Sequence, residues 1–134
     1  MIIKEDLWDV LEDMGFSMGR DICIRHFANI NADIRVDIVH EKIIYPEALQ
    51  YERATTLNFS ENENFVVLDC IVRLMEMGYR PEQIRLEAGV PGGHADNKAG
   101  YCDILVSDND GNEYLIIECK TTEQKETDEF WQKL

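Results

Sequence analysis

Two apolar runs near the C-terminal end of the chain, joined by a short turn sequence, constrain the fold most. Residues 101–107 and 113–120 are rich in Ile, Leu, Val and Tyr, which is typical of β-strands. The segment between them reads DNDGN, and its Asp110-Gly111 pair favours a tight hairpin turn. A loop of residues 110–111, or a symmetric loop of residues 109–112, sets Asp103 directly opposite Glu118, with Cβ atoms roughly 5 Å apart.

This predicted hairpin gathers charged side chains on one face of apolar strands. Side chains alternate along a strand, so Lys120 shares the face of Glu118, whereas Ile117 and Cys119 point into a packed layer. Two carboxylates this close repel, and a divalent cation such as Mg²⁺ would relieve the repulsion. Asp103 and Glu118 are therefore candidate metal ligands, and the backbone carbonyl of Cys119 is a third. The alternative is a structural salt bridge from Lys120 to Glu118 or Asp103.

The rest of the chain shows helical and strand patterns in alternation. Leu7, Val10, Leu11 and Met14 have helical spacing, which predicts an amphipathic helix over residues 7–16. Alternating or β-branched apolar residues predict strands at 21–28, 33–39, 42–45 and 84–88, with irregular connections at 46–60 and 91–100.

A second helix is predicted from Ser60 to about Met77, followed by Gly78. Ser60 and Glu63 have the spacing of a capping box, in which each side chain bonds a free backbone N–H of the first turn. We expect a single α/β domain over residues 1–134, with an N-terminal helix and strands at 1–45 and a core at 60–134 that holds the hairpin.

Composition narrows the functional classes. The four cysteines form no CxxC pair, so a zinc site is not expected, and reduced thiols indicate a cytoplasmic protein. No apolar stretch is long enough to cross a membrane. The net charge of −14 opposes strong DNA binding by the chain alone. The chain stops at Leu134 without a closing element, which predicts a fragment of a longer protein.

Gly100–Val106, a short hairpin and then Leu115–Lys120 resemble the D…ExK core of the PD-(D/E)XK nuclease superfamily. More narrowly, the chain resembles the N-terminal nuclease domain of type I restriction enzyme R subunits, and related domains that precede N-6 adenine DNA methylase modules. In that family a helix with a glutamate precedes the core and ends in Gly-Tyr. Here Glu63 leads such a helix, which ends at Gly78-Tyr79, and the resemblance spans about residues 43–125.

The resemblance implies a restriction endonuclease-like core, a central mixed sheet flanked by helices. It implies that Asp103 and Glu118 bind Mg²⁺ or Mn²⁺, that Lys120 is the catalytic lysine, and that Glu63 is an accessory acid. The substrate would be double-stranded DNA. The chain would act on it together with the methyltransferase, specificity and translocase domains or subunits of the same system. For Glu63 the alternative is the capping-box role with Ser60.

Two departures from the family pattern stand out. Cys102 occupies the place where relatives often have proline before the aspartate. Gln124 and Gln132 are candidates for a glutamine beyond the catalytic lysine, but no tyrosine follows either one. One rival interpretation is an inactive nuclease-fold module that binds DNA or protein, and another is an acidic interaction domain without a nucleic-acid role.

Overall fold

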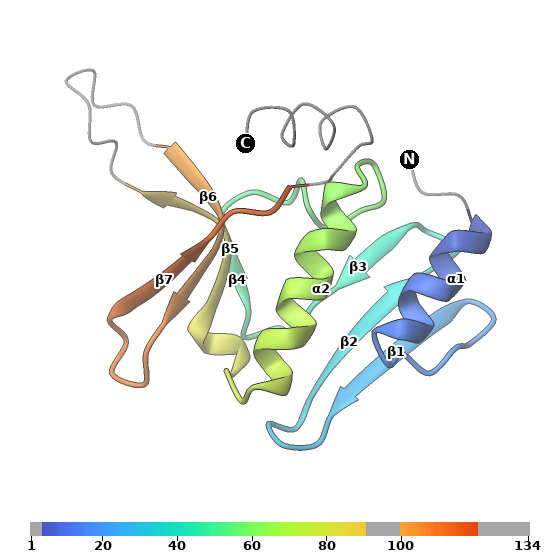
Figure 1. Ribbon diagram of the computed structural model, residues 1–134, viewed down its shortest axis with the longest axis horizontal. Coiled ribbons are helices and arrows are strands. Elements are labelled where there is room, and N and C mark those ends of the chain that lie inside the picture. Colours follow the sequence, from blue (N-terminus) through green and yellow to red (C-terminus); the bar gives the residue numbers. More distant parts are fainter. Residues whose placement is uncertain (1–3, 91–99, 121–134) are drawn as a thin grey trace, which may run out of the picture.

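A computed structural model describes residues 4–90 and 100–120 of the chain, and Figure 1 shows the arrangement. The predicted α/β class is confirmed by two α-helices and two β-sheets. In chain order the elements are α1 (Lys4–Asp13), β1 (Ile22–Phe27), β2 (Ala32–Asp37), β3 (Lys42–Ile44), β4 (Gln50–Tyr51), α2 (Glu63–Glu76), the 3₁₀ turn η1 (Pro81–Gln83), β5 (Ile84–Val90), β6 (Gly100–Ser107) and β7 (Glu113–Ile117). The predicted loop at 91–100 and the candidates Gln124 and Gln132 lie outside the described residues, except for Gly100, which begins β6.

The strands divide between two sheets. Strands β1, β2 and β3 form an antiparallel three-stranded sheet in chain order. The second sheet has the order β4-β5-β6-β7 and is mixed, because β4 runs parallel to β5 while the other pairs are antiparallel. The sequence predicted the strands of both sheets except β4, which falls in the segment expected to be an irregular connection.

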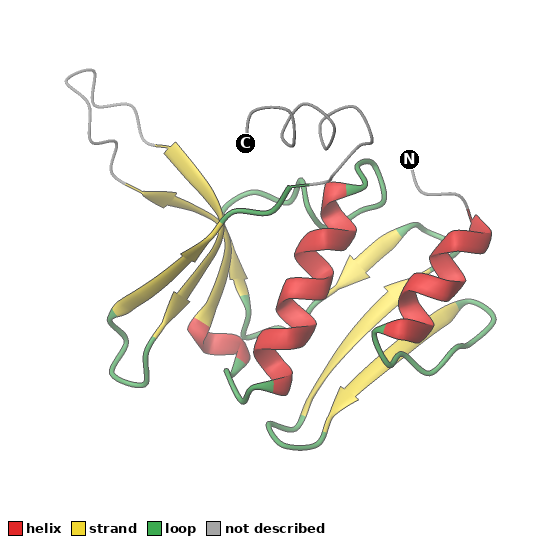
Figure 2. Cartoon of the chain, viewed as in Figure 1, coloured by secondary structure: helices red, strands yellow, loops and turns green. Residues whose placement is uncertain are grey.

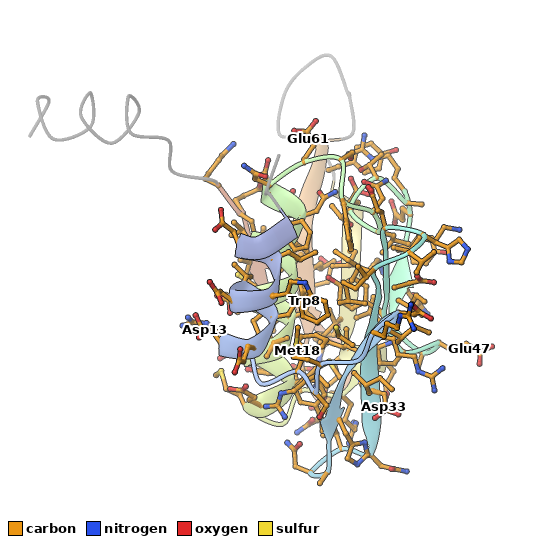
Figure 3. The ribbon with its side chains drawn as sticks, turned by 90° about the vertical axis from the view of Figure 1, so that its right-hand side faces the viewer. Trp8, Asp13, Met18, Asp33, Glu47 and Glu61 are labelled. Atoms are coloured by element: carbon orange, nitrogen blue, oxygen red, sulfur yellow. The ribbon has the colours of Figure 1, made fainter. Side chains whose placement is uncertain are left out.

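One continuous core joins the two sheets. Figures 1 and 2 show α2 at the centre, with the strands of the two sheets spreading to either side of it. Buried side chains of α2 include Leu68, Ile71 and Met75, and the same core contains residues of α1 and of both sheets. Figure 3 shows α1 on one side of the molecule, with partly buried Trp8 between this helix and the strands.

The predicted hairpin register is confirmed. Ile104 pairs with Ile117, Leu105 with Ile116, and Val106 with Leu115, which is the predicted register. The predicted symmetric loop is wrong, because the pairing shifts by one residue between Val106 and Ser107, and Ser107 pairs with Glu113. The Asp108 carboxylate accepts hydrogen bonds of 2.9 Å from the backbone N–H groups of Asp110 and Asn112. Gly111 has a φ of 85°, a conformation that glycine adopts without strain. Strand β7 nevertheless ends at Ile117, so the prediction that it continues to Lys120 is wrong.

The start of α2 differs from the prediction. The N-cap is Asn62, and no side chain caps the helix. The backbone N–H and the hydroxyl of Ser60 both bond Oδ1 of Asn58. The predicted capping box of Ser60 and Glu63 is therefore wrong, because Asn58 holds Ser60 outside the helix. Glu63 is the first residue of α2.

Strand β7 forms one edge of the four-stranded sheet within the described part of the chain. Tyr114 is 65% exposed, Leu115 39% and Ile116 55%, so large apolar side chains of this strand reach solvent. Neither described helix has the length and apolar character that a membrane-spanning segment needs.

Candidate metal and catalytic site

The carboxyl groups of Asp103 and Glu118 lie next to each other where the β6–β7 ladder ends. Continuing the register beyond Ile104 and Ile117 sets the two residues opposite one another. Desolvation is the largest cause that raises the pKa of the exposed Glu118 carboxyl above its usual value, and the nearby negative charge of Asp103 is the next. Two neighbouring carboxylates repel each other, and a bound cation would relieve that repulsion.

Cys119 contributes its backbone to this site and its side chain to the core. Its backbone N–H donates a hydrogen bond of 2.7 Å to Oδ2 of Asp103. Its thiol is 2% exposed and packs in the main core, as the alternation of side chains predicted. The bond holds the segment after β7 beside β6, even though regular strand pairing has ended there.

Glu63 approaches the same region from α2. Burial is the largest cause of the raised pKa of the Cys119 thiol, followed by its contact with Cys70, and the charges of Asp103 and Glu63 raise it further. In Figure 1 the segment that follows β7 runs toward the N-terminal end of α2, where Glu63 lies. Asp103 and Glu63 thus lie near enough to Cys119 for their charges to act on its thiol, and Glu118 is its neighbour in the chain.

Lys120 is exposed and stands close enough to Glu118 for its positive charge to oppose the rise in the pKa of that carboxyl. Within residues 4–90 and 100–120, no salt bridge of 4.0 Å or less joins Lys120 to Glu118 or Asp103. The structural salt bridge considered as the alternative is thus absent from the described part of the chain. Lys120 is therefore an exposed residue next to Cys119 and two positions from Glu118.

The donor atoms of this site suit a hard cation that keeps several water ligands. Among the described residues, no group of three His, Cys, Asp or Glu side chains converges closely enough to hold a metal ion. Mg²⁺ binds through one or two carboxylates with water completing its shell, so Asp103 and Glu118 are sufficient in number. Glu63 would then contact the cation indirectly, through a water molecule.

Sequence reasoning missed a buried acid, Glu87, which lies one strand away on β5. It is 5% exposed and has a φ of 47°, an unusual conformation for a residue other than glycine. Its carboxylate accepts hydrogen bonds from the backbone N–H and the hydroxyl of Thr55, and Arg53 lies 3.5 Å away. The available signal was one acidic residue in a predicted strand whose other charged residue is Arg85.

Comparison with known proteins gives one match. The family model described as Type I restriction enzyme R protein N terminus (HSDR_N) matches residues 62–134, which is more than half of the chain. This range begins one residue before α2 and includes β5, β6 and β7 with all the candidate site residues. No curated protein matches the chain.

Proposed function

We propose that this chain is a nuclease domain of the PD-(D/E)XK type, and the premise is that it belongs to the type I restriction enzyme R protein N-terminal family. The family gives the chain a role in restriction-modification. The proposed reaction is Mg²⁺-dependent hydrolysis of DNA phosphodiester bonds. The observation that carries this proposal is the placement of Asp103 opposite Glu118 where the β6–β7 ladder ends, with Asp103 held by the N–H of Cys119 and with exposed Lys120 next in the chain.

Asp103 and Glu118 would hold the cation, Mg²⁺ or Mn²⁺, together with the carbonyl oxygen of Cys119. The bound cation would supply Lewis acidity and lower the pKa of a coordinated water. Asp103 is oriented by the N–H of Cys119. Glu118 must be deprotonated to act as a ligand, and because its pKa is raised, cation binding should weaken as the pH falls.

Lys120 carries an ammonium group that can donate a hydrogen bond toward the substrate. Its ammonium group would bond a phosphate oxygen or orient the attacking water, and so stabilise the charge that grows in the transition state. Glu63 would accept a hydrogen bond from a water molecule at the same place. These roles need Lys120 free of a salt bridge, as it is among the described residues.

The substrate we infer is double-stranded DNA, presented by the methyltransferase, specificity and translocase partners of a restriction-modification system. The net charge of −14 makes strong binding by the chain alone unfavourable, so these partners would supply most of the affinity. A cytoplasmic location stays a prediction.

Cleavage of plasmid DNA by the full-length protein with Mg²⁺ tests the proposal. Replacing Lys120 by Ala should lower the cleavage rate by about 100-fold or more while the fold is kept. Lys42→Ala is the matched control, because Lys42 is an exposed lysine on β3 of the other sheet. Equal cutting by the wild type and Lys120→Ala would remove this lysine from the mechanism.

The net charge of −14 favours a second candidate, a module that keeps the nuclease fold without catalysis. Calorimetric titration with Mg²⁺ or Mn²⁺ separates the two candidates. A nuclease should bind the cation and lose that binding in Asp103→Asn and Glu118→Gln, but not in Glu47→Gln. Figure 3 shows Glu47 projecting away from the body of the molecule, which makes it a suitable control.

A further inference from the structure

Two free thiols meet between α2 and the segment that carries the candidate site. The Sγ atoms of Cys70 and Cys119 lie 3.7 Å apart, although 49 positions separate the residues in the chain. Cys70 is partly exposed on α2, whereas Cys119 is almost fully buried. The hydroxyl of Tyr45, which packs against the same core, is buried without a hydrogen-bond partner among the described residues.

We propose that Cys70 and Cys119 are a reversible oxidation site, and that their disulfide ties the segment of Glu118, Cys119 and Lys120 to α2. A disulfide has a sulfur–sulfur distance of about 2.05 Å, so the two sulfur atoms would approach by roughly 1.6 Å. Side-chain rotation with a small backbone shift supplies a movement of this size. Cys23 and Cys102 are also buried and free, but no contact between either thiol and another cysteine occurs within the described residues.

The oxidant we name is a peroxide, and the partly exposed thiol is where it reacts first. The sulfur of Cys70 attacks one oxygen of hydrogen peroxide, the O–O bond breaks, and a sulfenic acid and one water form. The sulfur of Cys119 then attacks the sulfur of Cys70, the S–O bond breaks, and the thiol proton of Cys119 leaves with the hydroxyl group as a second water; because the pKa of that thiol is raised, this is the slower step. Two thiols and one peroxide thus give one disulfide and two waters, and the two electrons lost by sulfur reduce the peroxide.

The position of Cys119 connects this bond to the candidate site. Its backbone N–H holds Oδ2 of Asp103, and its chain neighbours are Glu118 and Lys120. A pull on its side chain toward α2 therefore shifts the backbone that orients the two acids. Lower DNA cleavage by the oxidised protein is the expected consequence. That consequence rests on the proposed function, whereas formation of the disulfide does not.

The first experiment reads the bond directly. The full chain is treated with hydrogen peroxide, its remaining thiols are alkylated, and it is digested without reductant for mass spectrometry. We expect a loss of two hydrogen atoms from the intact mass and a linked peptide pair containing Cys70 and Cys119, which dithiothreitol reverses. The thermal unfolding midpoint should rise by roughly 5–10 °C on oxidation, because the bond closes a long loop.

Variants make the assignment specific. Cys70→Ser should abolish both the linked peptide and the thermal shift, and it changes a partly exposed residue that folding tolerates. Cys102→Ala, the matched control, should keep both. A folded wild-type protein that accumulates sulfenic or sulfinic acid at Cys70 without a link to Cys119 would overturn the proposal.

The activity measurement separates this proposal from the proposed function. Cleavage with Mg²⁺ is compared for the reduced and the oxidised protein, with Cys70→Ser treated in the same way. Loss of cutting only in oxidised wild type supports control of the site by the disulfide, and equal cutting by both forms of wild type overturns that control. A reduced wild type that never cuts contradicts the nuclease proposal and leaves the disulfide to be judged from its mass and thermal shift.

Discussion

The backbone N–H of Cys119 lies 2.7 Å from Oδ2 of Asp103 and donates a hydrogen bond to it. This bond joins two segments at the point where regular pairing of β6 and β7 has stopped. It gives Asp103 a structural role besides the proposed role as a metal ligand. The two roles respond differently to substitution, which makes them separable.

Asp103→Ala and Asp103→Asn should therefore behave differently. The alanine variant leaves the Cys119 N–H without its acceptor, so the free energy of unfolding should fall by about 1–3 kcal/mol in a urea titration. The asparagine variant keeps an acceptor oxygen and should unfold close to wild type, yet lose Mg²⁺ binding in calorimetry. Two variants with equal stability and intact metal binding would contradict both roles.

Glu118 predicts a pH dependence of stability whose sign can be worked out. Its pKa in the folded chain lies above the ordinary value of 4.5, so its contribution to stability is full below that value and is lost as pH rises through the raised pKa. Mg²⁺ should offset this loss increasingly with rising pH, because cation and proton compete for the same carboxyl groups. Thermal unfolding from about pH 4 to about pH 8, with and without Mg²⁺, measures both effects.

Glu118→Gln removes the titrating group while keeping the size of the side chain. The metal-free variant should lack the loss of stability assigned to Glu118, and Mg²⁺ should no longer raise its unfolding midpoint. Glu47→Gln serves as the control and should follow wild type. If the unfolding midpoint of Glu118→Gln equals that of wild type at every pH, the proximity of Glu118 to Asp103 does not affect stability.

Gly111 tests the turn that sets the register. Alanine at a φ of 85° is strained, so Gly111→Ala should lower the free energy of unfolding by about 1–2 kcal/mol. No atom within 4 Å would meet the added Cβ, so the loss measures backbone strain alone. Gly100→Ala, where the space is equally open and φ is not positive, should change stability by less than about 0.5 kcal/mol. Equal effects of the two variants in urea titrations would refute this account of the turn.

Glu87 should prove more important for stability than any exposed acid. Glu87→Ala leaves the Thr55 N–H without its acceptor and removes the charge that faces Arg53, at a cost of about 2–3 kcal/mol. Glu87→Gln retains an acceptor oxygen and should lose less, whereas Glu47→Ala should be nearly neutral. Denaturant unfolding of the three variants checks the order, and a neutral Glu87→Ala would exclude a structural role for this network.

Local chemistry in the sequence was enough to predict the hairpin and the pairing of its strands at Ile104 and Ile117. It did not predict the one-residue shift between Val106 and Ser107, which lies between the turn and these pairs, whereas alternation correctly sends Cys119 into the core. The apolar stripe of α2 and the stop at Gly78 are likewise local signals, and the helix lies close to where the sequence predicts it.

The features that sequence reasoning missed depend on contacts between distant segments. Strand β4 has two residues, too few for any periodic pattern, and it exists because β5 offers it a parallel partner. The conformation of Glu87 depends on Thr55, which is 32 positions away. Ser60 fails as a helix cap because the side chain of Asn58 competes for it. The contact between Cys70 and Cys119 likewise depends on the packing of α2 against the end of β7.

Among the described residues β7 is an edge strand, and this gives the negative charge of the chain a further role. An edge strand with apolar side chains in solvent can pair with the same strand of another molecule. Glu113 begins β7 and Glu118 follows its end, and every copy carries a net charge of −14. Electrostatic repulsion between copies thus opposes their association through the apolar edge of β7. Concentrated salt weakens this effect, because it shortens the range of the repulsion.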